Sequence, residues 1–193
     1  MDYKFFLKGI INIILNPVKA WDTIYSVNTP VKVIRNSLLF PLIILVSVSA
    51  FAGSLVYANA DLNWTYSIFV GLKYFLLLVI TIFTTSVIFS EITYPLDLGK
   101  DFKVSFSIIT YSAVPFLLCQ ILSGIFESLL FVNIIGFYGL YIFWTGTEKM
   151  LNPAQHKKMP MAIATTICLL GIFVITNLVL NKLIDKIYYS FFS

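Results

Sequence analysis

The chain has 193 residues, of which 59% are hydrophobic and only 11% are charged, and its net charge is +4. A soluble domain is about 45–50% apolar and about 25% charged, because its surface must face water. This composition excludes a soluble globular domain and predicts that lipid surrounds most of the chain. No basic run is longer than Lys157-Lys158, so the positive charge favours a membrane-orientation signal over nucleic-acid binding.

Residues 1–30 are predicted to form a cytoplasmic, amphipathic segment. Lys4, Lys8 and Asn12 follow at helical spacing on one face, and apolar residues cover the rest as far as Ile14. The pattern predicts an interfacial helix whose Lys4 and Lys8 face lipid phosphates; the alternative is a helix packed on the bundle. A cleaved signal peptide is not expected, because Lys8 interrupts the apolar run and no small-residue cleavage site follows.

A break is predicted at Asn16-Pro17, because the residue before a proline is pushed out of the α-helical region. The residues after it are typical of a second short amphipathic helix, with Pro17 in its first turn. Trp21 and Tyr25 are predicted to anchor this helix in the headgroup zone, which such rings prefer.

Five apolar runs are long enough to cross a hydrocarbon core of about 30 Å as helices. They cover about 36–57, 66–90, 103–124, 130–149 and 160–182. The predicted fold is therefore all-α: a polytopic membrane protein with a five-helix transmembrane domain at 31–185. Residues 186–193 are expected to form a short non-cytoplasmic tail.

The third and fourth runs are separated only by Glu127. One helix of their combined length would be far too long to cross once. The chain is therefore expected to turn between Ser123 and Asn133, in a tight hairpin with Glu127 at its tip. Pro115 is expected to kink the third span.

The basic residues that flank the spans predict the orientation. Ten of them fall in the N-terminal segment and in the loops after spans two and four, whereas only Lys182 and Lys186 flank the spans on the opposite side. The N-terminus is therefore expected in the cytoplasm, the C-terminus outside, and the protein in the cytoplasmic (inner) membrane.

The sequence offers no group for catalysis, cofactor binding or metal binding. Its sole histidine, His156, has no cluster of potential ligands around it, and Cys119 and Cys168 lie inside apolar runs, where packing thiols are expected. Nucleotide-binding, zinc-protease and serine-hydrolase motifs are absent from the sequence. An enzyme is not expected, and an enzyme acting on lipid is less expected than a scaffold or a transporter.

One charge lies inside a predicted span. Lys73 is expected near the outer end of span two, at the same level as Glu127. A charge in hydrocarbon is costly unless it finds a partner, so the sequence suggests a Lys73–Glu127 pair. The alternative is a lysine that extends to the interface beside an exposed glutamate.

Small and hydroxylated residues gather on two spans. Thr81, Thr84, Thr85 and Ser86 lie on span two, and Gly136, Gly139 and Gly146 lie on span four. Such residues let helices approach closely in lipid, so they are expected to serve packing, with a conduction path as the alternative.

Three short motifs follow one another along the chain in a characteristic order. Asn16, Pro17 and Trp21 form an N-P-x-x-x-W segment before the spans, Pro115 ends Tyr-Ser-Ala-Val-Pro, and Gly136 and Gly139 flank Phe137-Tyr138. From about residue 5 to residue 183 the chain resembles the bacterial branch of the Yip family, named for interaction with Ypt/Rab GTPases. The resemblance implies a five-span bundle with a cytoplasmic N-terminus. Eukaryotic members carry a longer acidic N-terminal region with a D-L-Y-G-P-type motif, which is missing here, so no Rab-dependent role is implied.

These observations predict a non-enzymatic membrane scaffold or partner-binding module. Its expected partners are membrane lipids and other membrane proteins; no nucleic acid or cofactor is expected, and the oligomeric state is left open. The alternative is a small transporter or channel, with Lys73, Glu127 and the Thr81 and Thr85 hydroxyls along a polar path.

Overall fold

The computed structural model describes residues 3–57 and 64–192, and every regular element among them is a helix. Five stretches are long and apolar enough to cross a membrane: Val31–Tyr57, Trp64–Leu96, Phe102–Ile125, Ser128–Leu151 and Gln155–Tyr188. The predicted all-α polytopic fold is therefore confirmed. The helices extend beyond the ranges predicted from hydropathy, because a helical backbone can continue past the apolar part of its sequence.

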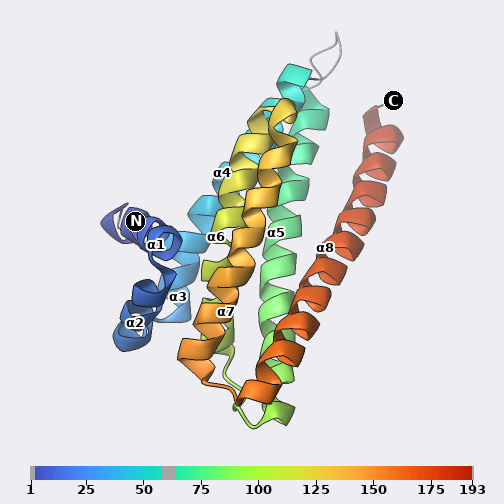
Figure 1. Cartoon of the computed structure of the whole chain (residues 1–193). Helices are drawn as coiled ribbons and strands as arrows, with labels where there is room; N and C mark the ends of the chain where they lie inside the picture. The colour runs from blue at the N-terminus through green and yellow to red at the C-terminus, as the bar shows by residue number, and fades with distance from the viewer. Residues whose placement is uncertain (1–2, 58–63, 193) are drawn as a thin grey trace.

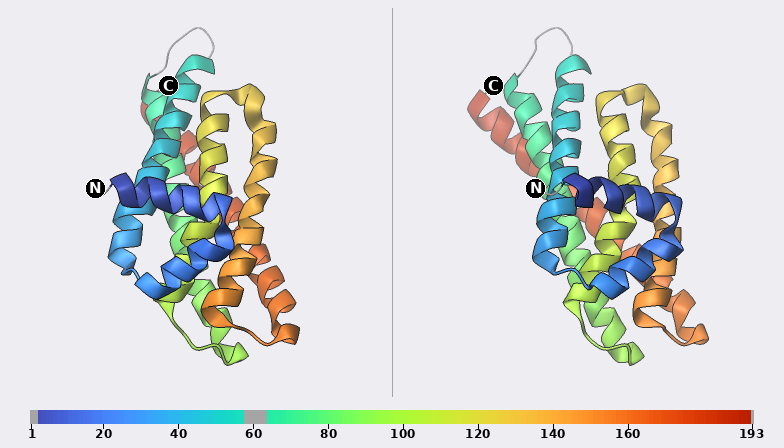
Figure 2. Two further views of the ribbon diagram at one scale, coloured as in Figure 1. Left: turned by 60° about the vertical axis from the view of Figure 1, so that its left-hand side comes forward. Right: turned by 90° about the vertical axis from the view of Figure 1, so that its left-hand side faces the viewer.

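Two helices precede the spans, α1 (Tyr3–Leu15) and α2 (Pro17–Val27), and they cross one side of the bundle (Figures 1 and 2). The predicted break lies between them. Asn16 caps α2, because its side-chain Oδ1 accepts a hydrogen bond of 3.4 Å from the Lys19 N–H. Pro17 occupies the first turn, where its missing N–H has no helical partner to lose.

The first span consists of α3 (Val31–Ile34), the π-helical turn η1 (Arg35–Leu39) and α4 (Phe40–Tyr57). The wide turn ends two residues before Pro41, whose ring would clash with the carbonyl of Ser37 in a regular α-helix. In η1 the Phe40 N–H donates to the Arg35 carbonyl, five residues back, rather than to the carbonyl four residues back as in an α-helix. The widened turn therefore lets the span continue through a proline.

The remaining spans are α5 (Trp64–Thr93), α6 (Phe102–Ile125), η3 (Glu127–Phe137) continued by α7 (Tyr138–Leu151), and α8 (Gln155–Phe192). The α5–α6 and α7–α8 connections lie at one end of the bundle, and the α6–η3 turn and the end of α8 lie at the other (Figure 1). This arrangement is the alternation that five crossings require.

The core lies where α4, α5 and α6 meet, and it includes the fully buried Leu42, Ile43 and Phe106. α6 is the most enclosed span, with 56% of its most apolar window buried, whereas the corresponding share in α8 is 11%. α8 packs chiefly on α5 and diverges from α7 (Figures 1 and 2). It is therefore a peripheral helix with most of its surface left to lipid.

The expected hairpin between spans three and four is present. α6 ends at Ile125, Phe126 adopts an extended conformation, and Leu129 departs from helical geometry before η3 continues. Gly124 remains inside α6, so the turn is tighter than the range predicted for it. α6 runs through Pro115 without interruption, and the predicted kink at Pro115 stays a prediction.

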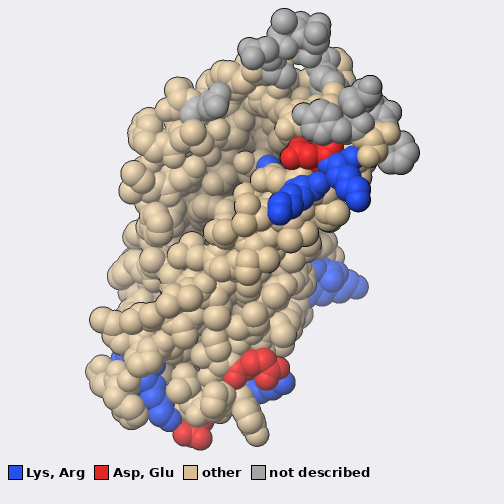
Figure 3. Space-filling view, turned by 90° about the vertical axis from the view of Figure 1, so that its right-hand side faces the viewer, with Lys and Arg blue, Asp and Glu red and all other residues tan. Residues whose placement is uncertain are grey.

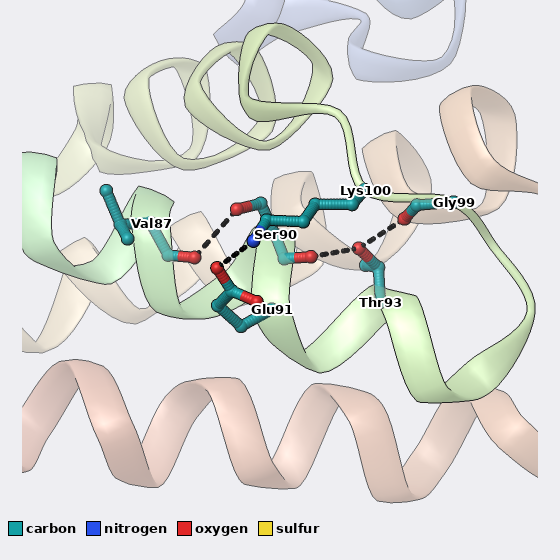
Figure 4. Close-up of polar contacts among 6 residues, drawn as sticks. All are labelled: Val87, Ser90, Glu91, Thr93, Gly99 and Lys100. Atoms are coloured by element: carbon teal, nitrogen blue, oxygen red, sulfur yellow. Dashed lines mark hydrogen bonds and ion pairs between the residues drawn. The ribbon is translucent and has the colours of Figure 1, made fainter.

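The α5–α6 connection begins later than the sequence suggests, because α5 continues to Thr93 and the 3₁₀ turn η2 (Tyr94–Leu96) follows. Figure 4 shows how the connection is held: Thr93 Oγ1 donates to the carbonyls of Ser90 and Gly99, at 2.9 and 2.8 Å, and Lys100 pairs with Glu91. Gly99 has a positive φ of 79°, which favours glycine there.

Candidate functional site

The N-terminal helices are fixed to the bundle through Trp21. This side chain is fully buried, and its Nε1–H donates to the carbonyl of Ile142 on α7, at 3.0 Å. The ring meets Tyr111 edge to face, with centroids 5.8 Å apart. A Cβ at Gly146 would lie 2.4 Å from the Trp21 ring, so the glycine makes room for it. The prediction of a headgroup anchor at Trp21 is therefore wrong.

The physical reason is that α7 offers Trp21 a better environment than the headgroup zone. A glycine one turn after Ile142 exposes that residue's carbonyl, so the indole N–H is satisfied while its ring packs on the helix. Tyr25, by contrast, is 58% exposed, as expected for an interfacial ring.

Polar contacts hold the same unit at further points. Asp22 pairs with Lys149 of α7, and Lys103 Nζ of α6 donates to the Asn28 carbonyl and Oδ1, at 2.9 and 2.6 Å. The Tyr138 hydroxyl donates to the carbonyl of Ile14, at 3.0 Å. α1 and α2 are therefore attached to both α6 and α7.

α1 combines the two alternatives that the sequence left open. Its Ile13 is fully buried against the bundle, so the helix is packed on the spans. Its opposite side exposes Leu7, Ile11 and Leu15 at helical spacing, next to the exposed Lys8. The side chain of Lys4 lies outside the described residues. The exposed stripe suits contact with lipid.

Lys73 has a partner that the sequence analysis did not name. Its Nζ donates to Asn181 Oδ1 of α8, at 3.1 Å, and lies 4.8 Å from the centroid of the Tyr74 ring. Asp185, one helical turn beyond Asn181, attracts the ammonium electrostatically. The side chain of Glu127 lies outside the described residues, so the Lys73–Glu127 pair stays a prediction.

A signal for this contact was available in the sequence. Asn181 and Asp185 lie four residues apart, hence on one face of a helix, at the polar end of an otherwise apolar run. Which span that face would meet depends on the tilt of α8 across α5, and one sequence does not reveal helix tilt.

A double-mutant cycle measures this contact. We expect Asn181→Leu to destabilise the protein by about 1–2 kcal/mol, because it leaves a half-buried ammonium short of a hydrogen bond. In the Lys73→Met background the same change should cost less, with a coupling energy of about 0.6–1.7 kcal/mol. Thermal unfolding in detergent provides the measurement, and the exposed Lys182→Met is the matched control. Additivity of the two single changes would show that the contact contributes nothing.

A cleft opens between α7 and α8, with α5 and α6 as its floor. Its volume is about 370 Å³, and none of the described residues that line it is charged. Figure 3, which looks onto the α8 side, shows a largely uncharged face; apart from one basic group at its right-hand edge, the charged side chains lie toward the two ends. Phe116 of α6 and Phe173 of α8 meet edge to face across the cleft, with centroids 5.9 Å apart.

The predicted packing role of the span-four glycines agrees with their surroundings. A Cβ at Gly139 would lie 2.3 Å from the Ser112 carbonyl, and one at Gly136 would lie 3.2 Å from the Cα of Phe116. Both glycines therefore let the fourth span approach α6 on either side of the buried Pro115. These motif positions shape the helix contacts around the cleft.

Residues 11–177 match the Yip1 domain family. The chain belongs to this family. The resemblance inferred from the order of motifs is thereby confirmed, while its assignment to the bacterial branch stays a prediction. Comparison with curated proteins and with solved structures gave no match.

The Yip1 domain covers the Trp21 docking contact and the cleft, but it ends before Asn181 and Asp185. In the described part of this Yip1 domain protein, no group of three or more His, Cys, Asp or Glu residues is placed to hold a metal ion. Cys119 is buried and Cys168 half-buried, both as free thiols. The features that stand out are therefore two: the docked N-terminal helices and the apolar cleft.

Proposed function

We propose that this Yip1 domain protein is a non-catalytic membrane scaffold. Its N-terminal helices lie against the cytoplasmic leaflet and bind other membrane proteins there. The observation that supports this role is the docking of α2, where Trp21 is buried against Ile142 and Gly146 of α7. A helix pair held in this way presents its exposed apolar stripe and Lys8 in one orientation, as a scaffold requires.

The proposed orientation has the N-terminus in the cytoplasm. It rests on the ten basic residues that flank the spans on one side, and the protein is proposed to lie in the cytoplasmic membrane. The contacts of α2 with Lys149 and Lys103 tie the N-terminal helices to the same end of the bundle.

A reporter that is active only in the cytoplasm tests this orientation. Fused after Ser193 it should be silent, because five crossings place the two ends of the chain on opposite sides. Inserted in the connection at 152–154 it should be active. Activity at Ser193 would overturn the proposed orientation.

Site-specific photocrosslinking in living cells tests the scaffold role. A photoreactive residue at Ile11, on the exposed stripe of α1, should give discrete protein adducts, and these should be lost when Trp21→Ala releases the N-terminal helices. The same probe at Val48, an exposed position of α4, is the control for random collisions. Equal adduct patterns at both positions would contradict a scaffold that acts through α1.

Transport is the second candidate, because Lys73 and Asn181 form a polar contact within the spans. The uncharged lining of the cleft speaks against an ion path through it. Solute or ion flux in liposomes containing the purified protein, abolished by Lys73→Ala, would favour transport over the scaffold.

A further inference from the structure

The cleft between α7 and α8 has the chemistry of a binding site for a neutral molecule. Four phenylalanines line it, contributed by α6, η3, α7 and α8: Phe116, Phe137, Phe143 and Phe173. A charged group would lose its hydration there without gaining a partner, so phosphates and ammonium groups are excluded. Since the cleft lies between membrane-spanning helices, its ligand arrives from the bilayer.

Two hydroxyls distinguish the cleft from a plain apolar groove. Thr81 is only 4% exposed, and neither Thr81 Oγ1 nor Ser112 Oγ has a hydrogen-bond partner among the described residues. The hydroxyls of Thr165 and Thr166 on the opposite wall already have partners, because each donates a hydrogen bond to a carbonyl one turn back on α8, at 2.8 Å. The Thr81 and Ser112 oxygens are buried as well as unpartnered in the described part of the chain, so each becomes a donor to a ligand that carries an oxygen once its side chain turns toward the cleft.

The depth of these donors identifies the class of lipid. Ser112 lies ten residues from the start of α6 and thirteen from its end, or about 15 and 20 Å along the axis. The ester carbonyls of a phospholipid lie at the edge of the hydrocarbon core, about 15 Å from the midplane. A phospholipid therefore offers no oxygen at this depth, whereas an uncharged lipid that resides near the midplane does.

We infer that the cleft binds a lipid of the isoprenoid quinone class. One ring carbonyl accepts hydrogen bonds from Thr81 and Ser112, the flat ring packs among the phenylalanine faces, and the isoprenoid tail leaves into the bilayer between α7 and α8. Gly139, which lines the cleft beside Ser112, lets the fourth span pack closely on α6 there. This inference goes beyond the scaffold role and does not depend on it.

Native mass spectrometry of the purified full chain, titrated with decylubiquinone, tests the inference. The quinone should bind, and Thr81→Val and Ser112→Ala should each weaken it about three- to tenfold, the effect of one lost hydrogen bond. Thr85→Val is the matched control: Thr85 is also buried on α5 with an unpartnered hydroxyl, but it does not line the cleft. This variant should bind as the unaltered protein does.

Two further measurements complete the design. Leu170→Trp, which fills the cleft from α8, should abolish binding, and thermal unfolding should show that each variant is folded. Dioleoylglycerol, a neutral lipid without a ring, should bind more weakly than decylubiquinone. The absence of quinone binding, equal binding of dioleoylglycerol, or an equal effect of Thr85→Val would each overturn the inference. None of these results bears on crosslinking from α1, so the scaffold role is judged separately.

Discussion

Trp21→Ala is expected to destabilise the protein by about 3–5 kcal/mol, the loss typical of truncating a fully buried tryptophan. The change removes the ring that packs on Tyr111 and Gly146 and leaves the Ile142 carbonyl without the indole N–H. Thermal unfolding in detergent measures the loss. Protease sensitivity in the N-terminal helices should rise at the same time, because Trp21 holds α2 on α7.

Trp64→Ala is the matched control, since Trp64 is 59% exposed and its removal should change stability little. Gly146→Leu should reproduce the effect of Trp21→Ala, because any Cβ at this position meets the Trp21 ring. If Trp21→Ala and Trp64→Ala unfold at the same temperature, α2 is not held by Trp21.

Gly53→Ala is expected to destabilise the bundle by about 3 kcal/mol, at the upper end of typical overpacking costs. A Cβ at Gly53 would lie only 1.8 Å from the carbonyl oxygen of Gly124. The obstacle is backbone rather than a flexible side chain, so α4 and α6 must separate to admit a single methyl group. Unfolding in mixed micelles measures the change.

Gly171→Ala is the control with the opposite expected sign. Gly171 lies in α8, where no described residue comes within 4 Å of an added Cβ. Replacing a helical glycine by alanine in open space should stabilise the protein by up to about 1 kcal/mol. Equal effects of the two substitutions would contradict the close α4–α6 crossing at Gly53.

Many residues of the candidate site could be singled out from the sequence, but the residues that they contact could not. The glycines at 136, 139 and 146 were predicted to permit close approach, and each faces a neighbouring element across a short distance. Thr81 was noted as part of a hydroxyl cluster. Its place on the floor of a cleft depends on how α8 diverges from α7, and hydropathy carries no information on helix tilt.

The sequence by itself determined that lipid surrounds the chain and which segments cross the bilayer. Apolar runs that match the thickness of a bilayer must form helices in lipid, because every backbone polar group there needs a partner within its own segment. Only the tertiary structure decided which helices are neighbours. A helix face that contacts lipid and one that contacts another helix are both apolar, so the sequence does not tell them apart. For that reason Trp21, expected among headgroups, is buried on Gly146, and Lys73 lies beside Asn181, a residue more than a hundred positions away.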